Sequence, residues 1–408
     1  MTLPAQPELN IGVVGHVDHG KTSLVYNLTG IVTDTHSEEK KRGITIKLGY
    51  ADAIIYKCSK CSEYGAKPTC KKCSSQASEL KKVSFLDAPG HETLMATVIA
   101  ASSVMDGALF VISAAEKCPQ PQTIEHLMVL EAAGISKIVV CQNKVDLVTR
   151  EQAKASYKEI KTFLKGSAFE NAPIIPVSAS TGINTGYLLG AIYTEIQSRQ
   201  ANEGTPLMYI ARSFDVNKPG TTIDKLSGAV LGGSIVRGVF NKGDEIEIRP
   251  GAMRVKKEKE IIIPLKTTIQ SIHSGKQAIA SASTGGLIAF STDLDPALSR
   301  ADALVGCVVG KPGTLPLALS ELTLDVKPLK RQLEKFIDSF TPNEPLVLGV
   351  GTATTIGFVQ SAKKGKVKLI LKKQVCIDPS AKIAVMRRSK SRWHLYAAAT
   401  LAAQATQA

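Results

Sequence analysis

The sequence predicts three successive domains: an α/β domain with a parallel sheet covered by helices, then two β-barrels. Up to residue 202, apolar runs typical of buried strands alternate with segments of helical spacing. A linker with Gly204 and Pro206 follows, and beyond it Gly, Ser and Thr interrupt short β segments roughly every eight to twelve residues. A second break at 311–316 precedes another largely β region. We therefore place the domains at 1–202, 203–316 and 317–408.

Length and charge are consistent with several domains and a polyanionic partner. The chain has 408 residues, 44% of them hydrophobic, with 50 Lys and Arg against 36 Asp and Glu. The net charge of +14 favours RNA as a partner, although each basic cluster alone (256–259, 363–373 and 387–392) is more often a solvated face. No run of eighteen apolar residues occurs and the N-terminus has no signal region, so we expect a cytoplasmic protein with no membrane partner.

One segment near the N-terminus has the pattern of a phosphate-binding loop. It follows a predicted strand at 11–14, precedes a predicted helix at 23–28 closed by Gly30, and reads Gly15, His16, Val17, Asp18, His19, Gly20, Lys21, Thr22. Its glycines allow backbone N–H groups to face the phosphates, Lys21 adds a positive charge, and the Thr22 hydroxyl can bind Mg²⁺. A chance glycine-rich turn is the alternative, which the flanking strand and helix disfavour.

A second candidate segment follows the predicted strand at 83–86. Asp87 lies where a carboxylate can hold the Mg²⁺ shell, and Gly90 allows close approach of the backbone to a γ-phosphate. His91 can orient the attacking water, or it is simply a surface histidine.

Two further strand ends carry residues suited to a guanine base. The predicted strand at 137–142 leads to Asn143, Lys144 and Asp146, and the strand at 174–177 leads to Ser178, Ala179 and Ser180. Guanine offers two donors on one edge, which a carboxylate at Asp146 can accept, whereas adenine offers no such pair. The backbone N–H groups of 178–180 can bind the guanine oxygen. The nucleotide is therefore expected to be GTP or GDP.

The segment 42–46 lies between the phosphate loop and Asp87, where a nucleotide-dependent switch is expected. Thr45 can reach Mg²⁺ and the γ-phosphate only while that phosphate is present, although the segment alone resembles a turn before a strand. The predicted fold is thus an α/β P-loop GTPase domain followed by two β-barrels.

The cysteines fall into two groups. Cys58, Cys61, Cys70 and Cys73 form two CxxC pairs in a lysine-rich segment at 58–73, which predicts one structural Zn²⁺ site with four thiolates. Two disulfides, or a loop that has lost its metal, are the alternatives. The other four are expected to be buried as small apolar residues: Cys118, Cys141, Cys307 and Cys376.

Several local expectations complete the prediction. Helices are expected at 120–133 and 152–164, strands at 228–240 and 245–249, and a short amphipathic helix between Leu329 and Phe340. The single tryptophan, Trp393, is expected in a core.

The order of these motifs resembles the translational GTPases that carry tRNA, and in particular the gamma subunits of archaeal or eukaryotic translation initiation factor 2. The resemblance covers nearly the whole chain, with an archaeal character in the regular CxxC spacing. The segments that carry it are His36–Glu39, Gly43–Tyr50, the cysteine segment, Pro119–Thr123, Arg212–Gly220, Leu294–Pro296 and Val309–Gly313.

The resemblance implies a heterotrimer with alpha and beta subunits. Such a factor delivers initiator methionyl-tRNA to the small ribosomal subunit and hydrolyses GTP to GDP on release, slowly without an activator. Matching residues would hold phosphates (Lys21 and the Gly15–Gly20 backbone) and Mg²⁺ (Thr22 and Thr45), with an additional magnesium contact from Asp18 and the Gly43 carbonyl. His91 would position water, shielded by Val17 and Ile44.

The C-terminus departs from the family pattern. The family usually ends soon after the Arg-Trp pair in a strand with glycine, whereas here an alanine-rich run continues from Ala397 to Ala403.

Two other functions fit parts of the sequence. An elongation-type or selenocysteine-specific carrier of aminoacyl-tRNA would share the GTPase motifs and the barrels. A GTP-gated assembly scaffold with little intrinsic hydrolysis would keep the nucleotide site intact while turning over hardly any GTP.

Overall fold

The computed structural model describes residues 6–33, 48–91, 94–198, 204–218, 220–222, 226–256, 259–337 and 339–402. Gly43, Ile44 and Thr45, from the expected switch, lie outside the described residues. The chain divides into two compact units, Met1–Arg199 and Gln200–Ala408. Within the described residues, no helix is both long and apolar enough to cross a membrane.

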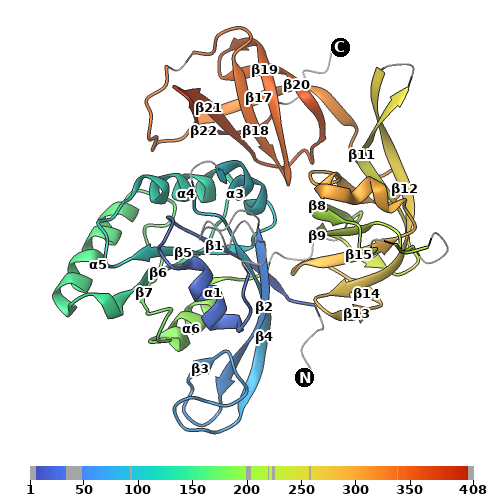
Figure 1. The fold of residues 1–408 in the computed structure, drawn as a ribbon. Coiled ribbons are helices and arrows are strands. Elements are labelled where there is room, and N and C mark those ends of the chain that lie inside the picture. Colours follow the sequence, from blue (N-terminus) through green and yellow to red (C-terminus); the bar gives the residue numbers. More distant parts are fainter. Residues whose placement is uncertain are drawn as a thin grey trace. The chain divides into compact units, whose positions relative to one another are not determined.

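The first unit is built on a seven-stranded sheet of order β3-β2-β4-β1-β5-β6-β7 (Figure 1). Strands β4, β1, β5, β6 and β7 are parallel, whereas β2 runs antiparallel to β4 and β3 antiparallel to β2. The strand bounds are β1 Leu9–Val14, β2 Gly49–Cys58, β3 Tyr64–Gly65, β4 Ala77–Asp87, β5 Gly107–Ser113, β6 Ile138–Asn143 and β7 Ile174–Pro176. Every residue of β1, β5 and β6 is buried, as expected for central strands covered on both faces.

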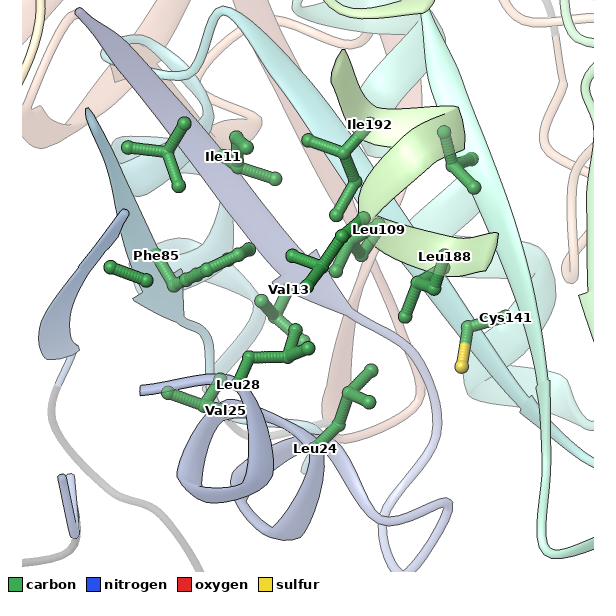
Figure 2. Packing of buried hydrophobic residues seen from close by; sticks show 14 of the residues in the cluster. Ile11, Val13, Leu24, Val25, Leu28, Phe85, Leu109, Cys141, Leu188 and Ile192 are labelled. Carbon is green, nitrogen blue, oxygen red and sulfur yellow. The ribbon is translucent and has the colours of Figure 1, made fainter. Parts of the chain in front are cut away.

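Helices cover both faces of this sheet. On one face, α1 and α6 pack on alternate residues of β1, including Ile11 and Val13, and on β5 and β6 (Figure 2). The helices α3, α4 and α5 lie on the other side in Figure 1. The helix bounds are α1 Lys21–Thr29, α3 Met95–Ser102, α4 Pro121–Ala132, α5 Arg150–Leu164 and α6 Thr185–Glu195, with a 3₁₀ turn η2 at Val145–Leu147. The expected helices at 120–133 and 152–164 are confirmed as α4 and α5.

The ends of these helices follow from local sequence. Gly30 ends α1 in the left-handed conformation with its N–H bonded to the Tyr26 carbonyl. Thr149 begins α5 with a capping box, because its hydroxyl accepts from the Gln152 N–H while the Gln152 side chain accepts from the Thr149 N–H.

The second unit begins with a closed antiparallel barrel. Its strands follow the order β11-β16-β8-β9-β15-β12, with β12 pairing back onto β11 and β13 added beside β12. The bounds are β8 Leu207–Phe214, β9 Val230–Arg237, β10 Phe240–Asn241, β11 Glu245–Lys256, β12 Lys259–Ser274, β13 Gln277–Ile279, β14 Ser281–Ala282, β15 Ile288–Thr292 and β16 Val308–Gly310, with η4 at Pro296–Asp302. Phe240 and Phe290 meet edge-to-face in its core.

A second closed barrel follows, in the order β17-β20-β19-β18-β21-β22. The bounds are β17 Ala318–Pro328, β18 Pro345–Val350, β19 Ala353–Lys363, β20 Lys366–Cys376, β21 Ile383–Ser389 and β22 Arg392–Leu401. The fold class of a GTPase-type α/β domain with two β-barrels is therefore confirmed. Lys366, Lys368 and Lys372 each follow or precede a buried apolar residue (Val367, Leu369 or Leu371), so their charges lie on the outer face of β20. Within the unit, Arg237 Nη1 of the first barrel donates to Asp378 Oδ2 of the second at 2.6 Å.

The alanine-rich C-terminus belongs to the second barrel. Residues 397–401 extend β22, where Ala397 and Ala399 are buried and pair with β17 and β21. The expectation for Trp393 is wrong, since its side chain is only half-buried on β22.

The expected helix between Leu329 and Phe340 is also wrong, because the described residues of this segment form no helix. The buried side chain of Arg387 donates hydrogen bonds to two backbone carbonyls of this segment. Nη1 donates to the Ile337 oxygen at 2.6 Å and Nη2 to the Ser339 oxygen at 3.0 Å. The aromatic residues whose spacing suggested a helix, Phe336 and Phe340, instead lie against Arg387 and Tyr396. Tertiary contacts decide the conformation here.

We predict that Arg387→Ala destabilises the second barrel by about 3–5 kcal/mol, because Glu344, which bonds both Nε and Nη2, is left partly buried without its partner. Urea unfolding followed by the fluorescence of Trp393 measures this directly. The exposed ion pair of Lys368 with Glu321 provides the control, and Lys368→Ala should cost less than about 1 kcal/mol. Equal effects of the two substitutions would contradict this account.

Candidate functional site

The segment Gly15–Gly20 forms a loop between β1 and α1 at the carboxyl end of the parallel strands, and Lys21 and Thr22 are the first residues of α1. Gly20 has φ 87° and Asp18 φ 61°, so the loop turns through the left-handed region twice. A Cβ on Gly20 would lie 2.4 Å from the Asn143 side-chain nitrogen, so only glycine fits. The loop is followed by the first turn of α1, whose N-terminus favours anions.

Lys21 is buried and bends back over the loop. Its Nζ donates to the Gly15 carbonyl at 3.0 Å and to the His16 carbonyl at 2.8 Å. A Cβ on Gly90 would lie 2.4 Å from this Nζ and 3.0 Å from the Val17 nitrogen. The structure therefore brings Gly90, three residues after the end of β4, directly against the loop between β1 and α1.

A buried carboxylate joins the loop to the neighbouring strand. Asp87 Oδ2 accepts from the Thr22 hydroxyl at 2.7 Å and from the Thr33 hydroxyl at 2.8 Å. Hydroxyl and carboxylate oxygens are the ligands that Mg²⁺ prefers, so Thr22 and Asp87 fit this ion. His91 follows on the same loop, half-buried, and its carbonyl accepts from the Leu94 N–H at 2.9 Å. Asp18, the other described candidate for magnesium, is exposed at the tip of the loop.

The residues proposed for the base converge on the next strand ends. Asn143 Nδ2 donates to the His19 carbonyl at 2.8 Å, while its Oδ1 accepts from the Ala179 N–H at 2.9 Å. Asp146 lies exposed beside Ser180, whose hydroxyl is 3.3 Å from Asp146 Oδ2. A hydrogen bond from the Ser178 hydroxyl lowers the pKa of Asp146, which keeps the carboxylate ionised and able to accept from a base. Lys144, with φ 62°, begins the turn that carries Asp146.

Two loop histidines are held neutral. Burial lowers the pKa of His19 to about 3, and its Nδ1 donates to the Val111 carbonyl at 3.1 Å. Burial also lowers the pKa of His16, whose ring lies 5.0 Å from that of His19. Because neither ring carries a charge near neutral pH, Lys21 is the positive group of the loop.

The cysteine segment forms two similar turns beside β3. The Cys58 and Cys70 carbonyls accept from the N–H groups of Ser62 and Ser74, at 2.9 Å in both turns. The closest Sγ–Sγ distances are 3.4 Å between Cys61 and Cys70 and 3.5 Å between Cys58 and Cys73. All four sulfurs lie within 4.8 Å of one another.

These distances agree with a metal site rather than with disulfides. A disulfide requires sulfurs about 2 Å apart, whereas a tetrahedron with Zn–S bonds of about 2.3 Å separates them by roughly 3.8 Å. Hydrogen bonds from the Ser75 side chain and backbone lower the pKa of the Cys73 thiol to about 6, which favours the thiolate at that one residue. The cluster can therefore hold Zn²⁺. The four other cysteines are buried, as expected.

Two residues at this site have no counterpart in the sequence prediction. Thr33 bonds the same oxygen of Asp87 as Thr22 does, and His126 of α4 bonds the backbone of Gly15. Thr33 gives no signal in the sequence, because it precedes the expected switch without a motif. His126 could have been noticed as a polar residue directly before the apolar run Leu127–Leu130.

The α/β domain with its loop between β1 and α1, followed by two barrels, has the architecture of a GTP-hydrolysing factor of protein synthesis, and the family comparisons show that class. In agreement, the family described as the elongation factor Tu GTP-binding domain matches residues 6–198. The family described as the C-terminal domain of initiation factor eIF2 gamma matches residues 320–401.

Full-length relatives identify the family. Translation initiation factor 2 subunit gamma of Methanococcus vannielii is 51% identical over 403 residues, covering 97% of this chain and 98% of the relative. The proteins of that name from Methanocaldococcus jannaschii and Archaeoglobus fulgidus are each 50% identical, covering 97% and 96% of this chain and 98% and 94% of the relatives. The chain belongs to the family of archaeal translation initiation factor 2 gamma subunits.

Solved structures share the fold. A bacterial selenocysteine-specific elongation factor EF-Sec matches with a TM-score of 0.76 and 24% identity, covering 98% of this chain and 60% of that one. Elongation factor SelB from Methanococcus maripaludis, in complex with the GTP analogue GppNHp, matches with a TM-score of 0.73 and 21% identity, covering 98% and 79%.

We predict that Asp146→Asn changes the base preference from guanine to xanthine. Xanthine carries a carbonyl where guanine carries its amino group, and the Asn amide can donate to that carbonyl, whereas guanine loses a charged acceptor. GTP affinity should fall by about 100-fold or more while XTP affinity rises, as measured by titration calorimetry. Glu151→Gln, on the exposed start of α5, should change neither the GTP affinity nor the XTP affinity. Unaltered GTP affinity in D146N would exclude Asp146 from base binding.

We also predict about one zinc ion per chain, measured by atomic absorption on the purified protein. Cys70→Ser should lose the metal and open the 58–76 segment to proteolysis. Cys118→Ser, which changes a buried cysteine outside the cluster, should keep both the zinc and the resistance of the 58–76 segment to proteolysis. Zinc retained at full occupancy in C70S would contradict a four-thiolate site.

Proposed function

We propose that this chain is the GTP-binding subunit of a heterotrimeric initiation factor, which delivers initiator methionyl-tRNA to the small ribosomal subunit in the cytoplasm. The observation that carries the proposal is the near full-length similarity to initiation factor 2 gamma subunits, together with the close packing of Gly90 and Asp87 on the phosphate-type loop. Alpha and beta subunits would complete the factor.

In this proposal the nucleotide lies along the carboxyl ends of β1, β4, β6 and β7. The Gly15–Gly20 backbone and Lys21 bind the phosphates, and Asn143, Lys144, Asp146 and residues 178–180 surround guanine. Lys21 would leave the Gly15 and His16 carbonyls to reach the β- and γ-phosphates, since its Nζ already lies at the loop.

Mg²⁺ would be held by Thr22, with Asp87 supporting its shell and Asp18, Gly43 and Thr45 adding contacts. Bound there, the ion would offset phosphate charge. The hydrogen bond between Thr22 and Asp87 supports this assignment, because it already aligns two oxygen ligands.

Hydrolysis would use His91 to orient water on the γ-phosphate side of the site. Its position one residue after Gly90, which packs on the loop, supports this role. Thr45 and Lys21 would stabilise the transferred phosphoryl group. The cysteine cluster is proposed to hold Zn²⁺ for structure only, because four protein ligands leave no open position.

The distinguishing property of an initiation factor is its choice of tRNA. With purified alpha and beta subunits, the GTP-bound complex should bind initiator methionyl-tRNA more tightly than the GDP-bound complex, and more tightly than elongator methionyl-tRNA. Filter binding or fluorescence anisotropy with each tRNA and nucleotide measures both preferences.

Three other outcomes would each contradict the proposal. Equal binding of all aminoacyl-tRNAs would indicate an elongation-type carrier. Preference for selenocysteyl-tRNA would indicate a selenocysteine-specific factor, whose fold this chain shares. Assembly of the three subunits with no tRNA binding would indicate a scaffold.

A further inference from the structure

The backbone at Gly15 is closely packed on the neighbouring strand β5. Gly15 has φ 146°, and a Cβ there would lie 2.2 Å from the Val111 carbonyl oxygen of β5. The glycine therefore packs against the next strand at the point where β1 becomes the loop. The carbonyl of the same residue accepts from Lys21 Nζ at 3.0 Å.

The side chain of His126, from α4, forms a hydrogen bond with the Gly15 backbone. His126 is fully buried, and its Nδ1 accepts from the Gly15 N–H at 3.2 Å. Because Nδ1 accepts, the ring is neutral and its proton is on Nε2. Burial and the charge of Lys21 lower the pKa of His126 to about 3, in agreement with a neutral ring.

We propose that His126 is a positioning residue for nucleotide binding, and that its Nδ1 fixes the first peptide of the phosphate loop. It does not touch the nucleotide. It acts through Gly15, whose N–H it accepts from and whose carbonyl accepts from Lys21 in this structure. This inference rests on the proposed binding of GTP phosphates by Gly15–Thr22.

The alternative is that His126 only fills space in the core between α4 and the sheet. Two substitutions separate the roles, because Asn and Gln carry the same amide at different distances from the backbone. The Asn side-chain oxygen can occupy the place of Nδ1, whereas the Gln amide extends to the place of Nε2. Gln is closer to His in volume, so packing alone favours H126Q over H126N.

The experiment measures GDP and GTP dissociation rates, with a fluorescent nucleotide, for the full chain as wild type, H126N and H126Q. Thermal unfolding without nucleotide is measured on the same samples. We expect H126N to stay within about threefold of wild type in dissociation rate, although it is the less stable variant. H126Q should release both nucleotides about tenfold faster or more, because the buried Gly15 N–H loses its acceptor.

The possible results are distinct. Dissociation rates that follow stability, with H126Q closer to wild type than H126N, would overturn the positioning role. So would equal rates in both variants. A wild-type protein that binds neither GTP nor GDP would instead overturn the proposed function, and this inference with it.

Discussion

The nucleotide site depends on the side-chain amide of Asn143, which lies at the end of β6 and joins two loops far apart in sequence. Its nitrogen bonds the His19 carbonyl in the phosphate loop, and its oxygen bonds the Ala179 N–H in the base loop. Both hydrogen bonds are buried, so water cannot readily replace either of them. Removing one would leave a buried polar group without a hydrogen-bond partner. In the proposed function, this bridge would hold the phosphate-binding and guanine-binding loops at a fixed separation.

This bridge also explains features nearby. Gly20 must lack a side chain because Asn143 occupies the space beside it. The neutral ring of His19, a residue of the loop itself, can be buried because its Nδ1 donates to the Val111 carbonyl of β5. The cysteine segment, in contrast, packs around its own small cluster of Tyr56, Cys58, Cys70 and Ala77, so its proposed zinc stabilises a local module.

Much of the site could be predicted from the sequence because local patterns encode it. The strand–loop–helix order around Gly15–Thr22 and the strand ends at Asp87 and Asn143 follow from parallel strands, whose carboxyl ends meet at one edge. The CxxC spacing likewise placed four sulfurs together. Thr33 and His126 could not be assigned, because their bonds to Asp87 and Gly15 join residues 54 and 111 positions apart.

In the barrels the sequence indicated the class of fold but not every segment. The apolar spacing between Leu329 and Phe340 favoured a helix, yet one arginine distant in sequence, Arg387, bonds the carbonyls that a helix would use. The alanine-rich C-terminus gave no clear strand pattern, since alanine is a poor β former. Its pairing with β17 and β21 follows from closure of the barrel.

We propose that one site both binds GTP and hydrolyses it, with binding by the phosphate loop and turnover through His91. Single-turnover GTP hydrolysis, in the presence of the partner subunits and small ribosomal subunits, tests it most directly when GTP affinity is measured on the same variant. His91→Ala should slow hydrolysis by about 10²-fold or more while keeping GTP affinity within about threefold of wild type. Unchanged hydrolysis in H91A would contradict it.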